Sequence, residues 1–225
     1  MSGGGDGLGP DARAALRRVL DLLAAERASV SSVVDERAWR VHVEDSLTGL
    51  EVPELRRARR IADVGAGAGF PGLVLAAALP AARVDLIESV RRKCDFMRRA
   101  IAAAGIANAR VVNARSEEVA AEDGREAYEA VTARAVGRLS TLAELASPLL
   151  VEGGALVAWK GRRDAEEEAQ LERAAEALAM RPLRVLDVGG RAGSEYRHLH
   201  VVVKSGPTPA NLPRKPGIAK KRPKG

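Results

Sequence analysis

Hydrophobic residues recur at helical spacing close to the amino terminus. Four apolar residues lie three or four positions apart: Leu16, Val19, Leu20 and Leu23. Pro10 stands where proline is favoured, at the first position of a helix. We therefore predict a helix over residues 10–27, within an N-terminal extension and helical lid region that spans residues 1–54.

Short apolar runs alternate with helical patterns from residue 60 onward. The expected strands are residues 60–64, 83–88, 109–113, 128–133, 154–160, 182–188 and 197–203. The expected helices are residues 71–79, 90–104, 139–147 and 164–179. Strands separated by helices indicate βαβ units with right-handed crossovers, and therefore a mainly parallel sheet with helices on both faces.

The last two expected strands depart from this alternation. Gly189, Gly190 and Gly193 lie between them, and no helical pattern fits there. These two strands should pair as an antiparallel C-terminal hairpin at one edge of the sheet. The sequence thus predicts an α/β, Rossmann-like domain with a seven-stranded sheet over residues 55–204.

A glycine cluster follows the first expected strand and precedes the first helix of the sheet. It occupies residues 63–72, with Gly65, Gly67 and Gly69 at alternate positions. Glycines there permit a tight turn and a close approach of backbone to a ligand, at the strand end that borders the crevice of such sheets. The stretch also fits G-x-G-x-x-G, so a dinucleotide site, and with it an NAD(P)-dependent oxidoreductase, is one interpretation.

Two acidic residues favour a different cofactor. Asp63 precedes the first glycine of the cluster by two positions, where a carboxylate would crowd a pyrophosphate but suit a cationic amino group. Glu88 ends the second strand, where a carboxylate can accept both ribose hydroxyls of an adenosine, although an acid favoured at a helix N-terminus is the alternative. S-adenosylmethionine carries the required amino group, a sulfonium and a ribose.

The net charge of +6 is concentrated at the C-terminus. Residues 204–225 contain seven basic residues, no acidic residue and five prolines, so the rest of the chain is nearly neutral. We predict that residues 205–225 form a basic, Pro-rich tail that stays outside the packed core and either aids solubility or contacts RNA phosphates. Its removal should then weaken RNA binding and leave cofactor affinity nearly unchanged.

Composition excludes several other chemistries. Cys94 is the single cysteine, which rules out an internal disulfide and is expected to pack in the core. His198 and His200 have no third ligand at metal spacing, so no metal is predicted. The sequence shows no signal-peptide pattern and no apolar stretch of membrane-spanning length. We therefore expect a cytoplasmic monomer without a membrane partner.

Several separated stretches resemble the bacterial small-subunit (16S) ribosomal RNA guanine-N7 methyltransferases, also called the glucose-inhibited division protein B family. The stretches are residues 42–47, 63–72, 132–135, 159–161, 197–199 and 213–218. The resemblance implies a class I methyltransferase that uses S-adenosylmethionine to methylate N7 of a guanine near the decoding centre. Its partner would be 16S rRNA in the small ribosomal subunit or an assembly intermediate. A non-catalytic, RNA-binding assembly factor with the same fold is the alternative.

The resemblance also implies a set of site residues. With Asp63 and Glu88, the cofactor pocket would contain Gly65, Gly67, Gly69, Phe70, Ser116, Glu117 and Arg134. Four further residues are candidates for a base or RNA pocket: His42, Asp45, Ser46 and Lys160. Each has a structural alternative: a local hydrogen-bonded cap for the first three, a solvated lysine for the fourth, and an ion-paired arginine for Arg134.

No general base is predicted for this chemistry. Guanine N7 has an in-plane lone pair and carries no proton, so methylation there requires no proton abstraction. The rate enhancement should come from alignment of N7 with the methyl carbon and from an environment that accepts a cationic purine.

Overall fold

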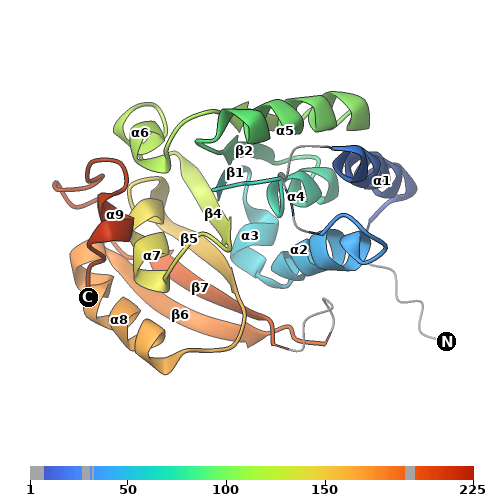
Figure 1. Cartoon of the computed structure of the whole chain (residues 1–225). Coiled ribbons are helices and arrows are strands. Elements are labelled where there is room, and N and C mark those ends of the chain that lie inside the picture. Colours follow the sequence, from blue (N-terminus) through green and yellow to red (C-terminus); the bar gives the residue numbers. More distant parts are fainter. Residues whose placement is uncertain (1–7, 27–30, 32, 191–195) are drawn as a thin grey trace.

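A seven-stranded sheet runs through the centre of the protein in the order β3-β2-β1-β4-β5-β7-β6 (Figure 1). The structure is a computed structural model that describes residues 8–26, 31, 33–190 and 196–225. The strands are β1 Arg60–Val64, β2 Arg83–Ile87, β3 Ala109–Val112, β4 Tyr128–Arg134, β5 Leu150–Lys160, β6 Met180–Asp187 and β7 His198–Lys204. Each of the seven predicted strands is present.

The pairing of the strands matches the prediction from the sequence. Strands β1 to β5 pair in parallel, whereas β7 runs antiparallel to both β5 and β6. The C-terminal hairpin is therefore confirmed, with β6 at the edge of the sheet and β7 inside it. The predicted glycine turn of the hairpin includes residues 191–195, which lie outside the described residues, as do residues 1–7.

Helices cover both faces of the sheet. They are α1 Pro10–Ala25, the π-helix η1 Trp39–Glu44, α2 Asp45–Leu47, the 3₁₀ helix η2 Thr48–Glu51, α3 Pro53–Arg57, α4 Gly72–Ala78, α5 Arg91–Ala104, α6 Ser116–Ala121, α7 Leu139–Ala146, α8 Ala165–Ala175, the 3₁₀ helix η3 Glu176–Leu178 and α9 Ile218–Lys221. Helices α1, α4 and α5 gather on one side and α7, α8 and α9 on the other (Figure 1).

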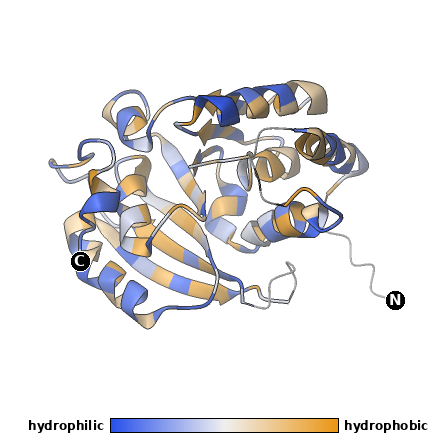
Figure 2. Cartoon of the chain, in the orientation of Figure 1, coloured by the Kyte–Doolittle hydropathy of each residue, from blue (hydrophilic) through white to orange (hydrophobic). Residues whose placement is uncertain are grey.

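Two apolar cores result from the alternation of side chains along the strands. Ile61 contributes to the core beneath α1, α4 and α5, whereas its neighbour Ala62 belongs to the core beneath α7 and α8. Val157 and Ala158 of β5 divide in the same way. Because both faces are covered there, residues 155–159 of β5 and 201–203 of β7 are continuous apolar runs, and orange segments mark these strands in Figure 2. Cys94 is buried, as predicted.

Besides α9 in the tail, two segments contain helices that the pattern of apolar residues did not predict. The stretch between the first helix and β1 forms the chain of short helices from η1 to α3, with Val43 and Leu55 fully buried. Helix α6 occupies part of the polar stretch after β3. It is only six residues long, so its periodicity cannot be read from the sequence, and Glu118 accepts a hydrogen bond from the Arg115 N–H at its start.

The prediction that residues 205–225 stay outside the packed core is wrong. Leu212 and Ala219 are buried, and Arg214 forms a bidentate ion pair with the buried carboxylate of Glu144 on α7. Lys204, counted with the basic tail, lies fully buried at the end of β7 and donates hydrogen bonds to the Ser147 carbonyl and the Thr208 hydroxyl. This segment packs despite its low apolar content. Two of its few apolar residues are buried, and the charged residues Lys204 and Arg214 have partners in the rest of the protein.

This packing yields a prediction for stability. Leu212→Ala should lower the free energy of unfolding by about 2–4 kcal/mol, because it removes a buried side chain and leaves a cavity. The exposed neighbour provides the control, and Asn211→Ala should change stability by less than about 0.5 kcal/mol. Chemical denaturation of both variants measures the difference. Equal stabilities would show that this segment is not packed.

Candidate cofactor pocket

A cavity of about 480 Å³ lies at the carboxyl ends of β1, β2 and β4. Its walls comprise Val64, Gly65, Ile87, Glu88, Ser89, Lys93, Ala114, Arg115, Ser116, Glu117, Ala135, Val136, Thr141, Leu145, Gly217, Ala219, Lys220 and Lys221. The sheet order reverses between β1 and β4, so the following chain segments leave on opposite faces and open a crevice there. The topology therefore places a ligand site at this position.

The glycine loop brings bare backbone to this cavity. Gly65, Gly67 and Gly69 have φ values of 68°, 61° and 96°, a region that side chains rarely allow. A Cβ atom on Gly65 would lie 2.8 Å from Val136 Cγ2, which is too close. A Cβ atom on Gly67 would have only the Gly65 carbonyl oxygen nearby, at 3.8 Å, so this peptide faces open space. A ligand can approach the backbone closely at Gly67.

Asp63 lies beneath the loop and is not among the residues that line the cavity. Its Oδ2 accepts a hydrogen bond from the Gly72 N–H at 2.9 Å, and its Oδ1 accepts one from the Thr132 hydroxyl at 2.9 Å. The residue is 1% exposed. The carboxylate thus ties β1 to β4 and to the start of α4, and its contact with a cofactor amino group stays a prediction.

Burial gives this carboxyl group an unusual acidity. Removal from water raises the pKa of Asp63 from an ordinary 3.8 to about 6, while the hydrogen bonds from Gly72 and Thr132 partly oppose the rise. Gly72 is required for the same packing, because a Cβ atom there would lie 2.8 Å from Asp63 Oδ2 and 2.2 Å from Leu86 Cδ2.

Glu88 is placed as the sequence predicts, at the end of β2 and against the glycine loop. Its two carboxylate oxygens accept hydrogen bonds from the Gly67 N–H at 3.1 Å and the Val90 N–H at 2.8 Å. The residue is 7% exposed and lines the cavity. A carboxylate already held by the glycine loop can accept further hydrogen bonds from a ligand in the cavity.

Ser116 and Glu117 form the wall next to β3. They begin α6, and both line the cavity. Glu117 Oε1 accepts a hydrogen bond from the Gly217 N–H at 2.8 Å, and Glu117 Oε2 lies 3.2 Å from the Ser116 hydroxyl oxygen. The C-terminal segment is therefore joined directly to a predicted cofactor residue.

Phe70 and Arg134 belong to a second cluster, beside the cavity. The His42 ring stacks on Phe70, with ring centroids 4.5 Å apart, and His42 Nε2 lies 2.9 Å from the Val33 carbonyl oxygen. Burial lowers the pKa of His42, which keeps the ring neutral. Arg134 Nη1 donates to the Val41 carbonyl at 3.1 Å and to Asp45 Oδ2 at 2.9 Å. These contacts fasten η1 over the glycine loop and the end of β4.

Asp45 is the buried anion of this cluster. It is 1% exposed, and its Oδ1 lies 2.7 Å from Arg197 Nε in an ion pair that lacks hydrogen-bond alignment. The Asp45 carbonyl accepts a hydrogen bond from Trp159 Nε1 at 2.9 Å. Ser46 is fully buried and donates its hydroxyl to the His42 carbonyl. The cluster joins the lid region to β4, to β5 and to Arg197, which precedes β7.

Lys160 lies apart from both groups of residues. Its Nζ donates to Glu167 Oε1 at 2.6 Å and to the Gly137 carbonyl at 3.0 Å. The side chain is 20% exposed. The lysine thus fixes the loop after β4, which also provides Val136 to the cavity wall.

The sequence analysis missed three parts of the cavity wall. Ala135 and Val136 follow β4, Thr141 lies on α7, and the segment from Gly217 to Lys221 comes from the tail. Two of these parts had a signal in the sequence, because Ala135 and Gly217 fall in the stretches 132–135 and 213–218 that carry the family resemblance. Ala135 adopts a φ of 59°, and an alanine in the sequence gives no indication of this backbone conformation.

Across residues 8–26, 31, 33–190 and 196–225, no helix is long and apolar enough to cross a membrane. The same residues contain no group of three or more histidine, cysteine, aspartate or glutamate side chains that could hold a metal ion.

The fold and the pocket together define a class I methyltransferase. A dinucleotide-binding sheet continues with a sixth parallel strand, in the order 3-2-1-4-5-6, whereas here the antiparallel β7 lies between β5 and β6. The acid at the end of β2 and the open backbone at Gly67 suit an adenosine. This topology disfavours the NAD(P)-dependent oxidoreductase.

The chain belongs to the family described as rRNA small subunit methyltransferase G, which matches residues 18–199. The ribosomal RNA small subunit methyltransferase G of Rubrobacter xylanophilus is 46% identical over 186 residues, covering 81% of this chain and 71% of that protein. The protein of the same name from Chloroflexus aggregans is 38% identical over 219 residues, covering 93% and 89%. A SAM-dependent O-methyltransferase structure from Thermotoga maritima shares the fold, with a TM-score of 0.60 and 13% identity over 85% of this chain and 72% of that chain.

The buried Asp63 predicts a specific dependence of stability on pH. The folded chain binds the proton of the Asp63 carboxyl group more tightly than the unfolded chain does. Protonation of Asp63 therefore favours folding below about pH 4, and this contribution to stability is lost as the pH rises through about 6. Asp63→Asn can retain both hydrogen bonds and has no such proton. The stability of the unmodified chain relative to Asp63→Asn should therefore fall by about 2 kcal/mol between pH 4 and pH 7.

Urea unfolding of the two proteins between pH 4 and pH 7 measures this difference. Subtracting one curve from the other removes the contributions of other carboxyl groups, which are common to both proteins. A constant difference across the range would contradict the assignment of a raised pKa to Asp63.

Proposed function

We propose that this protein transfers a methyl group from S-adenosylmethionine to N7 of a guanine in 16S rRNA. The relatives named above are methyltransferases of small-subunit rRNA, and the pocket has the chemistry that an adenosine cofactor requires. The acceptor is a guanine near the decoding centre, in the small ribosomal subunit or an assembly intermediate. We further propose that a single copy of the chain acts in the cytoplasm.

The position of Glu88 carries the proposal. Its carboxylate lies in the cavity wall at the end of β2, where it can accept hydrogen bonds from the two ribose hydroxyls of the cofactor. Gly67 leaves room for the cofactor next to the loop backbone, and Ser116 and Glu117 in the cavity wall would hold the adenine. Asp63 supports this arrangement from below by holding the glycine loop, and so acts as a positioning residue.

The surroundings of the pocket suit an acceptor that needs no deprotonation. The cofactor, when bound, supplies an electrophilic methyl group on a sulfonium. The two ring nitrogens of His42 face the Val33 carbonyl and the Arg134 guanidinium, and Lys160 is ion-paired, so neither side chain is arranged to accept a proton from a substrate. The residues beside the cavity therefore act by orienting the reactants, and Arg134 and Asp45 keep the lid region in place over the glycine loop.

Cations line the rim of the cavity. Lys93, Arg115, Lys220 and Lys221 are four lining residues from three different parts of the chain. Their positive charge favours approach of the RNA backbone, whereas Glu88 and Glu117 lie within the wall. This distribution attracts the polyanionic substrate and keeps negative charge where the cofactor binds.

Incubation with radiolabelled S-adenosylmethionine tests the proposed function. Intact small subunits, assembly intermediates and naked 16S rRNA are the three acceptors, and the labelled nucleotide is mapped in each. We expect label at N7 of one guanine. Binding of S-adenosylhomocysteine without transfer to any acceptor would instead favour the non-catalytic assembly role.

Glu88→Gln should weaken cofactor binding about 10- to 100-fold, because it removes charge-assisted hydrogen bonds to the ribose. The exposed residue Glu122 gives a matched control, and Glu122→Gln should bind S-adenosylhomocysteine like the unmodified chain. Isothermal titration calorimetry measures both affinities. Equal affinities in the two variants would remove Glu88 from the cofactor site.

The folded tail reverses the earlier prediction for its removal. Deletion of residues 213–225 should now weaken binding of S-adenosylhomocysteine at least tenfold, because it removes the wall formed by residues 217–221 and the partner of Glu117. Arg214→Ala should act in the same direction by releasing the segment from Glu144. Unchanged cofactor affinity in both variants, measured by calorimetry, would show that the tail forms no part of the pocket.

A further inference from the structure

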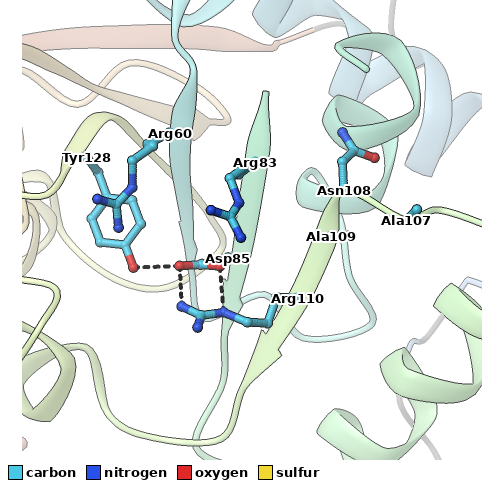
Figure 3. Close-up of a pocket in the computed structure, with 8 residues that line it drawn as sticks. All are labelled: Arg60, Arg83, Asp85, Ala107, Asn108, Ala109, Arg110 and Tyr128. Atoms are coloured by element: carbon cyan, nitrogen blue, oxygen red, sulfur yellow. Dashed lines mark hydrogen bonds and ion pairs between the residues drawn. The ribbon is translucent and has the colours of Figure 1, made fainter. Parts of the chain in front are cut away.

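A second pocket lies at the opposite end of the strands from the cofactor cavity. It has a volume of about 170 Å³, and Figure 3 shows its lining: Arg60, Arg83, Asp85, Ala107, Asn108, Ala109, Arg110 and Tyr128. Arg60 and Arg83 are the first residues of β1 and β2, and Tyr128 is the first residue of β4. The connection between β3 and β4 contains only the short helix α6. The surface at this corner of the sheet is polar.

Two like charges meet directly across neighbouring strands in this pocket. Arg60 pairs with Arg83 in the parallel register, and strands in a sheet lie about 4.8 Å apart. Like charges in such a position are destabilising. In the described part of the chain neither guanidinium has an ion pair or a side-chain hydrogen bond, and the contact of Arg60 is with the Tyr128 ring, 5.3 Å from its centroid.

The acid beside these arginines is already fully used. Asp85 is 8% exposed and accepts two hydrogen bonds from Arg110, at 3.0 Å and 2.7 Å, and one from the Tyr128 hydroxyl at 2.8 Å. Figure 3 shows Asp85 between these two partners, with Arg60 and Arg83 both on the side of Asp85 away from Arg110. The pocket therefore contains two guanidinium groups whose charge no neighbouring carboxylate neutralises.

Hydrogen bonds hold two parts of the pocket wall. The Asn108 side-chain amide donates to the carbonyls of Ala76, Leu79 and Ala82, which fixes the start of β3 to the connection between α4 and β2. The Asp85 network fixes Arg110 and Tyr128. Arginine forks on a wall held in this way are suited to bidentate recognition of a phosphate.

We propose that the pocket between Arg60 and Arg83 is a phosphate-binding site. The neighbouring cavity toward α6 is lined by Glu118, Glu122 and Asp123, so negative charge borders the site on that side and favours one phosphate group over a run of them. The phosphate belongs either to the backbone of the rRNA substrate, which rests on the proposed function, or to a small phosphorylated molecule.

Thermal unfolding in phosphate and in chloride at equal ionic strength tests the site. Phosphate should raise the Tm of the full chain, because a ligand that binds the folded state stabilises it. The double variant R60Q/R83Q should bind inorganic phosphate at least tenfold more weakly. It leaves the cations around the cofactor cavity unchanged, so a loss of the effect identifies this pocket.

The control variant is R56Q/R57Q, which removes the same charge from two exposed arginines of α3 outside the pocket. It should retain the response to phosphate. A second variant, R60K/R83K, keeps the charge and removes the forks, and it should bind phosphate with intermediate affinity. An equal phosphate response in R60Q/R83Q and the unmodified chain, or an equal loss in the control, would overturn the proposal.

Binding of a 16S rRNA fragment at several salt concentrations identifies the source of the phosphate. If the site holds the RNA backbone, the salt slope of R60Q/R83Q should be smaller than that of the control by about one, the value for one phosphate contact. If R60Q/R83Q and the control have equal salt slopes, while the unmodified chain binds phosphate and R60Q/R83Q does not, the site holds a small phosphorylated molecule. Methyl transfer is measured separately, so loss of the proposed function does not remove the phosphate response.

Discussion

The buried carboxylate of Asp63 connects the parts of the fold that make the cofactor pocket. Through Thr132 it links β1 to β4, the two strands between which the sheet order reverses, and through Gly72 it holds the first turn of α4. The glycine loop between β1 and α4 must therefore follow a fixed path over this side chain. Removal of the carboxylate from water has an energetic cost, which the raised pKa reflects, and a defined loop is the structural gain.

The second organising feature is that segments distant in sequence close the pocket together. The lid region contributes His42 against Phe70 and Asp45 against Arg134, while the C-terminal segment contributes Gly217 against Glu117. Phe70, Arg134 and Glu117, which receive these contacts, belong to chain segments that also border the cavity. A cofactor in the cavity would therefore be coupled to the order of both segments, since loss of either would leave buried charges without partners.

The sheet and its glycine loop could be predicted from sequence because their signals are local. The strand from Arg60 to Val64 is short, apolar and ended by glycines, and the hairpin of β6 and β7 follows from the lack of a helix between them. Helix α6 is too short to show a period. Tail packing depends on Glu144 and Glu117, which lie 70 and 100 residues away from their partners in the tail, and composition contains no information on such contacts.

The same limit applies to Asp63 and Asp85. Both acids lie on the central strands, and their sequence neighbours give no indication of which face they take. The structure puts Asp63 beneath the loop, on the face of α4, and Asp85 on the face of α6, with Arg110 and Tyr128. Because side chains alternate along a strand, one residue of register decides whether a charge meets a helix N-terminus or an arginine pocket. Charged residues of a parallel sheet therefore become interpretable only after the faces of its strands are assigned.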